Sequence, residues 1–176
     1  YSSRRQRQMC IRDSLLPVQT YSNPNGHDLV MTQVQSADHT THSSNNRAAA
    51  AEVVSDEWWF GFEQEFFFTD PTTGEPLGWE DGEPRAQGEF YCGVGAANVV
   101  GREISDAHLQ ACLDIGITLT GTNAEVALGQ WEYQCFGKGI KAADDLWVSR
   151  YLLFKTAEEY GVGVNIHPKP KTGDWN

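Results

Sequence analysis

The sequence predicts a fold of the α+β class, because it contains both strand-like and helix-like segments in a chain long enough to bury a core. Residues 58–68 and 130–134 are rich in aromatic residues and alternate in the manner of strands. Residues 105–116 and 142–160 carry apolar residues at helical spacing, and Gly161 follows the second run as a stop signal. We therefore expect a sheet with helices packed against it.

The remaining elements are predicted in chain order. Residues 28–35 suggest a short strand, and residues 47–54 form an alanine-rich run that favours a helix. Residues 69–93 contain glycine and proline at close intervals, which indicates a long excursion of turns. Ser105 is expected to cap the helix that follows it, and residues 115–122 and 162–166 alternate as strands.

The charge balance narrows the classes of function. The 176 residues contain 13 Lys plus Arg against 24 Asp plus Glu, a formal charge of -11. A chain this acidic lacks the basic surface that nucleic acids and anionic membranes require, so metal ions or cationic ligands are the better partners. No run approaches the roughly 18 to 20 apolar residues of a membrane span. The four cysteines are widely spaced, which favours free thiols and a cytoplasmic location.

Residues 1–14 differ in composition from the rest of the chain. They contain Arg4, Arg5, Arg7 and Arg12 against one acid, Asp13, and no apolar core of a signal peptide follows them. We interpret this leader as foreign to the fold and exclude it from fold prediction.

Two pairs of glutamates are the candidates for chemistry. Glu63 and Glu65 share one face of a strand whose other face carries Phe62, Gln64, Phe66 and Phe68. Solvated carboxylates, a metal site and an acid pair for glycosyl hydrolysis all fit this pattern. Glu125 and Glu132 lie seven residues apart across a Gly-containing turn, and four carboxylates together favour hard ions such as Mg²⁺ or Mn²⁺ over zinc.

Several sequence blocks, in order, resemble glutamine synthetase of type II. They are residues 59–65 (WFGFEQE), 91–96 (YCGVGA), 121–126 (GTNAEV), 129–134 (GQWEYQ), 168–170 (PKP) and 173–176 (GDWN). The resemblance covers about Asn23 to Asn176. It implies an antiparallel catalytic-domain sheet with packed helices, preceded by a remnant of a β-grasp domain.

The resemblance also implies an activity. Members of this family are glutamate–ammonia ligases, in which ATP phosphorylates glutamate and ammonia then displaces phosphate from γ-glutamyl phosphate. Two to three Mg²⁺ or Mn²⁺ ions offset the charge that develops in this phosphoryl transfer. The protein would be cytoplasmic and would form a homo-oligomeric ring with active sites shared between subunits.

The family's site residues transfer to matching positions of this chain. The implied metal ligands are Glu63, near the nucleotide phosphates, and Glu65, Glu125 and Glu132, near the substrate glutamate. The implied ATP-binding positions are Trp59, Glu63, Glu132, Tyr133, Gln134, Cys135, Phe136 and Gly137. The implied glutamate-binding positions are Glu65, Glu125, Asp174 and Trp175.

The chain also departs from the family pattern. The sequence contains neither the β-grasp Asp that deprotonates ammonium nor the family's Gly-rich segment with a metal-binding His, its phosphate-clamping arginines and its flap glutamate. We therefore expect a chain incomplete at both ends, without a complete catalytic set and inactive alone. The predicted parts are a leader (1–14), a β-grasp remnant with linker (15–46) and a truncated catalytic domain (47–176). The alternatives are a non-catalytic structural descendant of the fold and a ligase for another γ-glutamyl amine.

Overall fold

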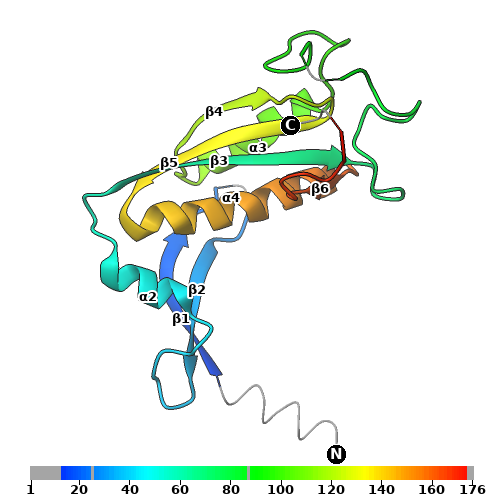
Figure 1. Ribbon diagram of the computed structural model, residues 1–176. Coiled ribbons are helices and arrows are strands. Elements are labelled where there is room, and N and C mark those ends of the chain that lie inside the picture. Colours follow the sequence, from blue (N-terminus) through cyan, green and yellow to red (C-terminus); the bar gives the residue numbers. More distant parts are fainter. Residues whose placement is uncertain (1–12, 25, 87, 174–176) are drawn as a thin grey trace, which may run out of the picture.

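A four-stranded antiparallel sheet with two helices against one face forms the body of the molecule (Figure 1). A computed structural model describes residues 13–24, 26–86 and 88–173. The strands are β3 (Trp59–Thr69), β4 (Leu119–Ala124), β5 (Gln130–Lys138) and β6 (Gly163–Asn165), in the spatial order β4-β5-β3-β6. The two helices are α3 (Arg102–Asp114) and α4 (Gly139–Glu159). The architecture confirms the predicted α+β class.

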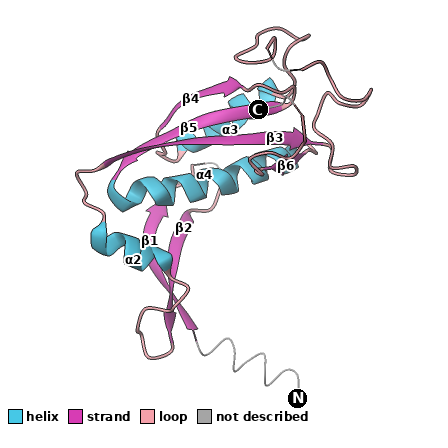
Figure 2. Ribbon diagram, viewed as in Figure 1, coloured by secondary structure: helices cyan, strands magenta, loops and turns pink. Residues whose placement is uncertain are grey.

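A second, two-stranded sheet lies on the far side of α4 from the main sheet (Figure 2). It pairs β1 (Asp13–Tyr21) with β2 (Leu29–Ser36), and the short helix α2 (Asn46–Val53) lies nearby. β1 was not predicted from the sequence, and it includes the last two residues of the segment that we had excluded. Arg47 of α2 pairs with Asp144 of α4 at 2.8 Å, and the Tyr21 hydroxyl donates to Asp145 at 2.7 Å. These polar contacts join the hairpin and α2 to the main body.

The core lies between the main sheet and the two helices. Alternate residues of β3 and β5 point into it, and Phe66, Phe68, Trp131 and Tyr133 are all at most 1% exposed. Leu153 of α4 packs in the same cluster. This alternation confirms the predicted faces of the two strands, because a period of two places every second side chain on the helix side. The opposite face is left for Glu63, Glu65, Gln130, Glu132 and Gln134.

The start of α3 was predicted wrongly. The helix begins at Arg102, and its N-cap is Gly101 at φ +84°, so Ser105 lies inside the first turn. A Cβ at Gly101 would lie 2.7 Å from the Phe68 ring, so the close approach of β3 selects glycine there. Ser105 is buried, and its hydroxyl lies 2.7 Å from the Thr122 hydroxyl of β4. The serine therefore joins helix to sheet instead of capping the helix.

None of the helices in the described part of the chain has the length and hydrophobicity of a membrane span.

Candidate metal and nucleotide site

The sheet face opposite the helices carries carboxylates on adjacent strands. Glu65 of β3 stands directly opposite Glu132 of β5, and Glu63 stands opposite Gln134. Asn123 of β4 is the partner of Glu132 on its other side. Opposed like charges destabilise an antiparallel pair unless a cation or a proton lies between them. The register alone therefore marks this face as a place for positive charge.

Glu125 joins this face from the turn that follows β4. It is only 7% exposed, as is Glu132, although both carry a carboxylate. Burial, and after it the neighbouring Glu132 and Glu65, raise the pKa of Glu125 to about 7. Partial removal from water and the charges of Glu132 and Glu63 raise the pKa of Glu65 as well. The four glutamates thus form one electrostatically coupled group, which the sequence spacing suggested only weakly.

Side-chain amides hold three of these carboxylates. Gln130 Nε2 donates to Glu65 at 3.0 Å, and Asn123 Nδ2 donates to Glu125 at 3.1 Å. Gln134 Nε2 donates both to Glu132 and, at 2.9 Å, to Asn123 Oδ1. Within the described ranges, none of the ion pairs includes Glu63, Glu65, Glu125 or Glu132. Neutral donors orient the site, and they leave its negative charge uncompensated.

The donor chemistry of this face fits a hard divalent cation. Carboxylates on adjacent strands supply the charge, and the side-chain amides of Asn123, Gln130 and Gln134 contact them through their nitrogens. As the side chains stand, no three acidic, histidine or cysteine groups among the described residues converge closely enough to enclose an ion. The amide contacts occupy the carboxylate oxygens, so binding a cation would require exchanging these hydrogen bonds.

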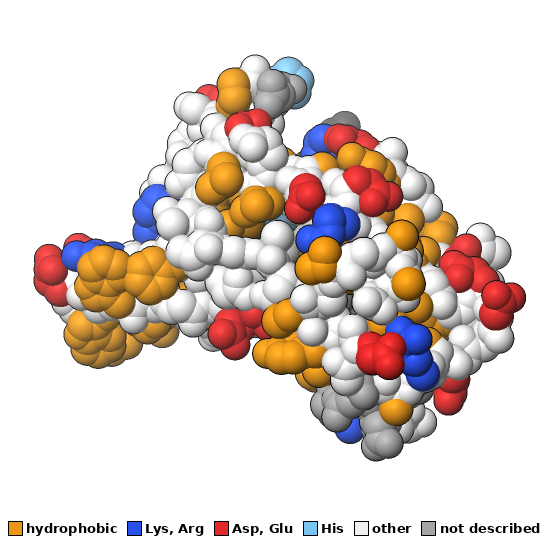
Figure 3. Space-filling view, turned by 90° about the horizontal axis from the view of Figure 1, so that it is seen from above, with side chains coloured by type: hydrophobic (Ala, Val, Ile, Leu, Met, Phe, Trp, Pro, Cys, Tyr) orange, Lys and Arg blue, Asp and Glu red, His pale blue; other side chains and the backbone are white. Residues whose placement is uncertain are grey.

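An aromatic surface adjoins the carboxylates at the start of β3. Trp58 and Trp59 are 54% and 61% exposed, and Figure 3 shows hydrophobic side chains gathered at this end of the molecule. The Trp59 ring lies 5.1 Å from the Phe136 ring of β5, and Lys138 Nζ lies 4.5 Å from the Trp59 ring centre. An exposed ring beside a cation suits a flat aromatic ligand that carries negative charge.

A cavity of about 240 Å³ lies between this aromatic surface and the carboxylates. Four of the predicted ATP-binding positions line it, namely Glu63, Gln134, Cys135 and Phe136. Tyr133 points the other way, because its hydroxyl lies 2.9 Å from Ser149 Oγ in the core. Its contribution to a nucleotide site would therefore come through its backbone.

The structure adds residues to the site that the sequence did not single out as site residues. Asn123 and Gln130 orient carboxylates, and both stand in the motif blocks beside the glutamates. In the neighbouring loop, the charges of Cys92 and then Glu125 raise the pKa of the exposed Tyr91. Cys92 N donates to Ala124 O at 2.9 Å and so brings the long loop to β4. Asp174 and Trp175 lie outside the described residues.

Fold and site together define an α+β domain whose open sheet face offers carboxylates suited to divalent cations, next to an exposed aromatic surface. Residues 39–175 match the family described as glutamine synthetase, catalytic domain. The chain therefore belongs to the glutamine synthetase family.

Several relatives carry the same family name. Residues of the chain are 56% identical over 118 residues to "Glutamine synthetase 1, mitochondrial" of Drosophila melanogaster, covering 66% of this chain and 29% of that protein. Identity to "Glutamine synthetase 2 cytoplasmic" of the same organism is 52% over 121 residues, which cover 66% of this chain and 32% of that protein. Identity to "Probable glutamine synthetase" of Caenorhabditis elegans is 43% over 183 aligned positions, which cover 94% of this chain and 48% of that protein. The matched part of the chain thus spans 29% to 48% of the length of these relatives.

Proposed function

We propose that the full-length protein containing this chain ligates ammonia to glutamate at the expense of ATP, through γ-glutamyl phosphate. The observation that carries the proposal is the group of four glutamates on one sheet face, with Glu65 directly opposite Glu132 and none of the described ion pairs reaching them. The family name of the relatives supports the same reaction. The substrates would be ATP, glutamate and ammonia.

The chain's own residues divide into three roles in this proposal. Glu63 would hold a Mg²⁺ or Mn²⁺ ion near the nucleotide phosphates, and Glu65, Glu125 and Glu132 would hold a second near the substrate carboxylate. Two to three such ions would offset negative charge on the transferred phosphoryl group. Trp59 and residues 132–137 would bind the nucleotide, supported by the Trp59–Phe136 pair and the adjacent cavity. Glu65, Glu125, Asp174 and Trp175 would bind glutamate.

The wider organisation is also part of the proposal. We propose a leader at 1–14, whose last two residues nevertheless pair in β1, a remnant of a β-grasp domain with its linker at 15–46 and the catalytic domain from residue 47. The separate β1–β2 sheet supports a boundary between the last two parts. The full-length protein would be a cytoplasmic ring of identical subunits that share their sites.

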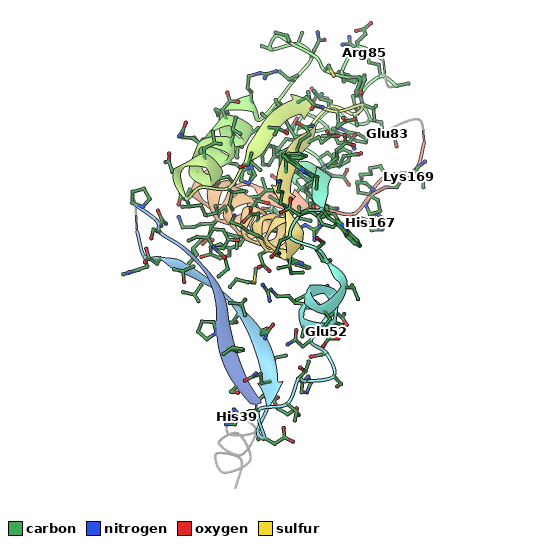
Figure 4. The ribbon with its side chains drawn as sticks, turned by 90° about the vertical axis from the view of Figure 1, so that its left-hand side faces the viewer. His39, Glu52, Glu83, Arg85, His167 and Lys169 are labelled. Atoms are coloured by element: carbon green, nitrogen blue, oxygen red, sulfur yellow. The ribbon has the colours of Figure 1, made fainter. Side chains whose placement is uncertain are left out.

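The test uses the complete protein and measures both glutamine formation and the binding of Mn²⁺. We expect glutamine formation that requires Mg²⁺ or Mn²⁺, and a loss of at least about a hundredfold in kcat/KM for Glu65→Gln and Glu132→Gln, since each removes a charged ligand. Glu52→Gln is the matched control, because Glu52 is an exposed residue on α2 (Figure 4). Titration calorimetry with Mn²⁺ should show the same ranking of binding.

The outcomes separate the alternatives. Mn²⁺ binding without glutamine formation, at saturating ATP, glutamate and ammonia, would favour a non-catalytic descendant of the fold. A clear preference for another amine over ammonia would favour a related γ-glutamyl ligase. We expect the 176 residues by themselves to form no glutamine.

A further inference from the structure

A lysine in the C-terminal loop reaches across to the long loop that follows β3. Lys171 Nζ forms an ion pair with the Glu75 carboxylate and lies 5.8 Å from the centre of the Trp79 ring. The lysine side chain is 29% exposed and Trp79 is 4% exposed, so the cation covers a buried indole. Figure 1 shows the red C-terminal segment beside the green loop. Two segments far apart in the sequence are thereby held together.

Trp79 in turn holds the turn that carries Glu125. Its indole Nε1 donates to the Leu128 carbonyl at 2.8 Å, and its ring packs with Phe67 and Ala127. The backbone of this turn lies close to the backbone of the long loop, because a Cβ at Gly129 would lie only 2.6 Å from the Leu77 carbonyl oxygen. The position of residues 125–129 therefore depends on the segment around Trp79.

The same turn continues to the carboxylates of the sheet face. Ala127 N donates to Gln130 Oε1 at 3.2 Å, and Gln130 Nε2 donates to Glu65 at 3.0 Å. A continuous path of contacts thus runs from Lys171 through Trp79 and the turn to Glu125 and Glu65. These are the two glutamates to which the proposed function gives both metal and glutamate binding.

Lys171 precedes the predicted glutamate-binding residues in the sequence, within the loop that follows β6. The other described contacts near this lysine are local, since Asn165 accepts from His167 N and His167 Nδ1 accepts from Lys169 N. Figure 4 shows His167 and Lys169 on this same loop. Lys171 differs from these two residues in pairing with a side chain of the long loop.

We propose that Lys171 is a positioning residue that, through Glu75 and Trp79, holds the long loop after β3 against the turn carrying Glu125. The inference rests on the proposed function in taking glutamate as the ligand bound near Glu125 and Glu65. Because Lys171 acts on these residues only through the loop and the turn, its loss should weaken the affinity for glutamate and leave phosphoryl transfer unchanged.

The test compares variants of the full-length protein. We expect Lys171→Met to raise KM for glutamate about three- to tenfold, the size of effect that one partly exposed ion pair and one cation–π contact can produce. KM for ATP and kcat should stay within about twofold of the parent. Glu75→Gln should reproduce the change, and Lys171→Arg should restore the parental value, because it keeps the cation. Lys155→Met, which breaks the exposed Lys155–Glu159 pair on α4, is the matched control.

Further measurements separate positioning from folding and from the proposed function. The thermal midpoint of Lys171→Met should lie within about 2 °C of the parent. The double variant Lys171→Met/Glu75→Gln should have a KM for glutamate no higher than that of either single variant, because both changes break the same ion pair. A glutamate KM equal to that of Lys155→Met, or equal losses in kcat and stability, would overturn the inference. Glutamate affinity measured by calorimetry tests it even without turnover. An inactive parent that binds glutamate refutes only the proposed function, whereas a parent that binds none refutes both.

Discussion

The ion pair between Arg47 and Asp144 should be worth several kcal/mol to the stability of the chain. Arg47 Nε and Nη2 each donate to one oxygen of Asp144, both at 2.8 Å, in the bidentate geometry that arginine favours. Asp144 is only 3% exposed, so the variant Arg47→Met leaves a carboxylate buried without its cation. Breaking a buried pair in this way costs about 3–5 kcal/mol. Because Arg47 is itself 22% exposed, we expect about 3 kcal/mol, the lower end of that range.

Urea unfolding of the chain followed by circular dichroism measures this quantity. The companion variant Arg47→Met/Asp144→Asn removes both charges, and we expect it to recover at least half of the loss, because no charge stays buried. Lys155→Met should cost at most about 0.5 kcal/mol, since its pair with Glu159 is exposed. If Arg47→Met costs no more than Lys155→Met, or if the double variant is less stable than the single one, the reasoning from burial is wrong.

Two further predictions concern a buried histidine and a crowded glycine. Burial lowers the pKa of His108 from 6.5 to about 4, so on acidification the unfolded chain takes up its proton first. The free energy of unfolding should therefore fall by up to about 3 kcal/mol as the pH drops from 6.5 to 4, and a His108→Gln variant whose stability falls equally would contradict this. Gly129→Ala should cost at least about 2 kcal/mol more than Gly116→Ala in urea unfolding, because both have a left-handed φ but only Gly129 faces a backbone oxygen within 3 Å. Equal losses would show that the backbone conformation alone sets the cost.

Much of the fold and part of the site follow from local patterns. The alternation along residues 62–68 predicted correctly that Glu63 and Glu65 share a face opposite Phe66 and Phe68, because the side-chain period of a strand is two. The apolar residues of 142–160 likewise predicted α4, which starts slightly earlier at Gly139. The family resemblance selected the same four glutamates, and it rested on blocks of sequence that can be read without coordinates.

Other features depend on which segments meet. Ser105 has the chemistry of an N-cap, but the approach of Phe68 selects Gly101 for that role and leaves the serine to contact Thr122. β1 has no clear alternation, and its pairing with β2 gives it the strand conformation. Neither outcome is encoded in neighbouring residues alone.

The sequence by itself determined the strand and helix periods and the acidic balance, because each depends on residue type and spacing along one segment, and its resemblance to the family singled out the four glutamates. Only the tertiary structure set Glu65 opposite Glu132, turned Tyr133 into the core and placed Lys171 over Trp79. Those contacts join residues up to about a hundred positions apart, and they are fixed by strand register and packing between loops. The charge at the site comes from the sequence, whereas its crowding comes from the fold.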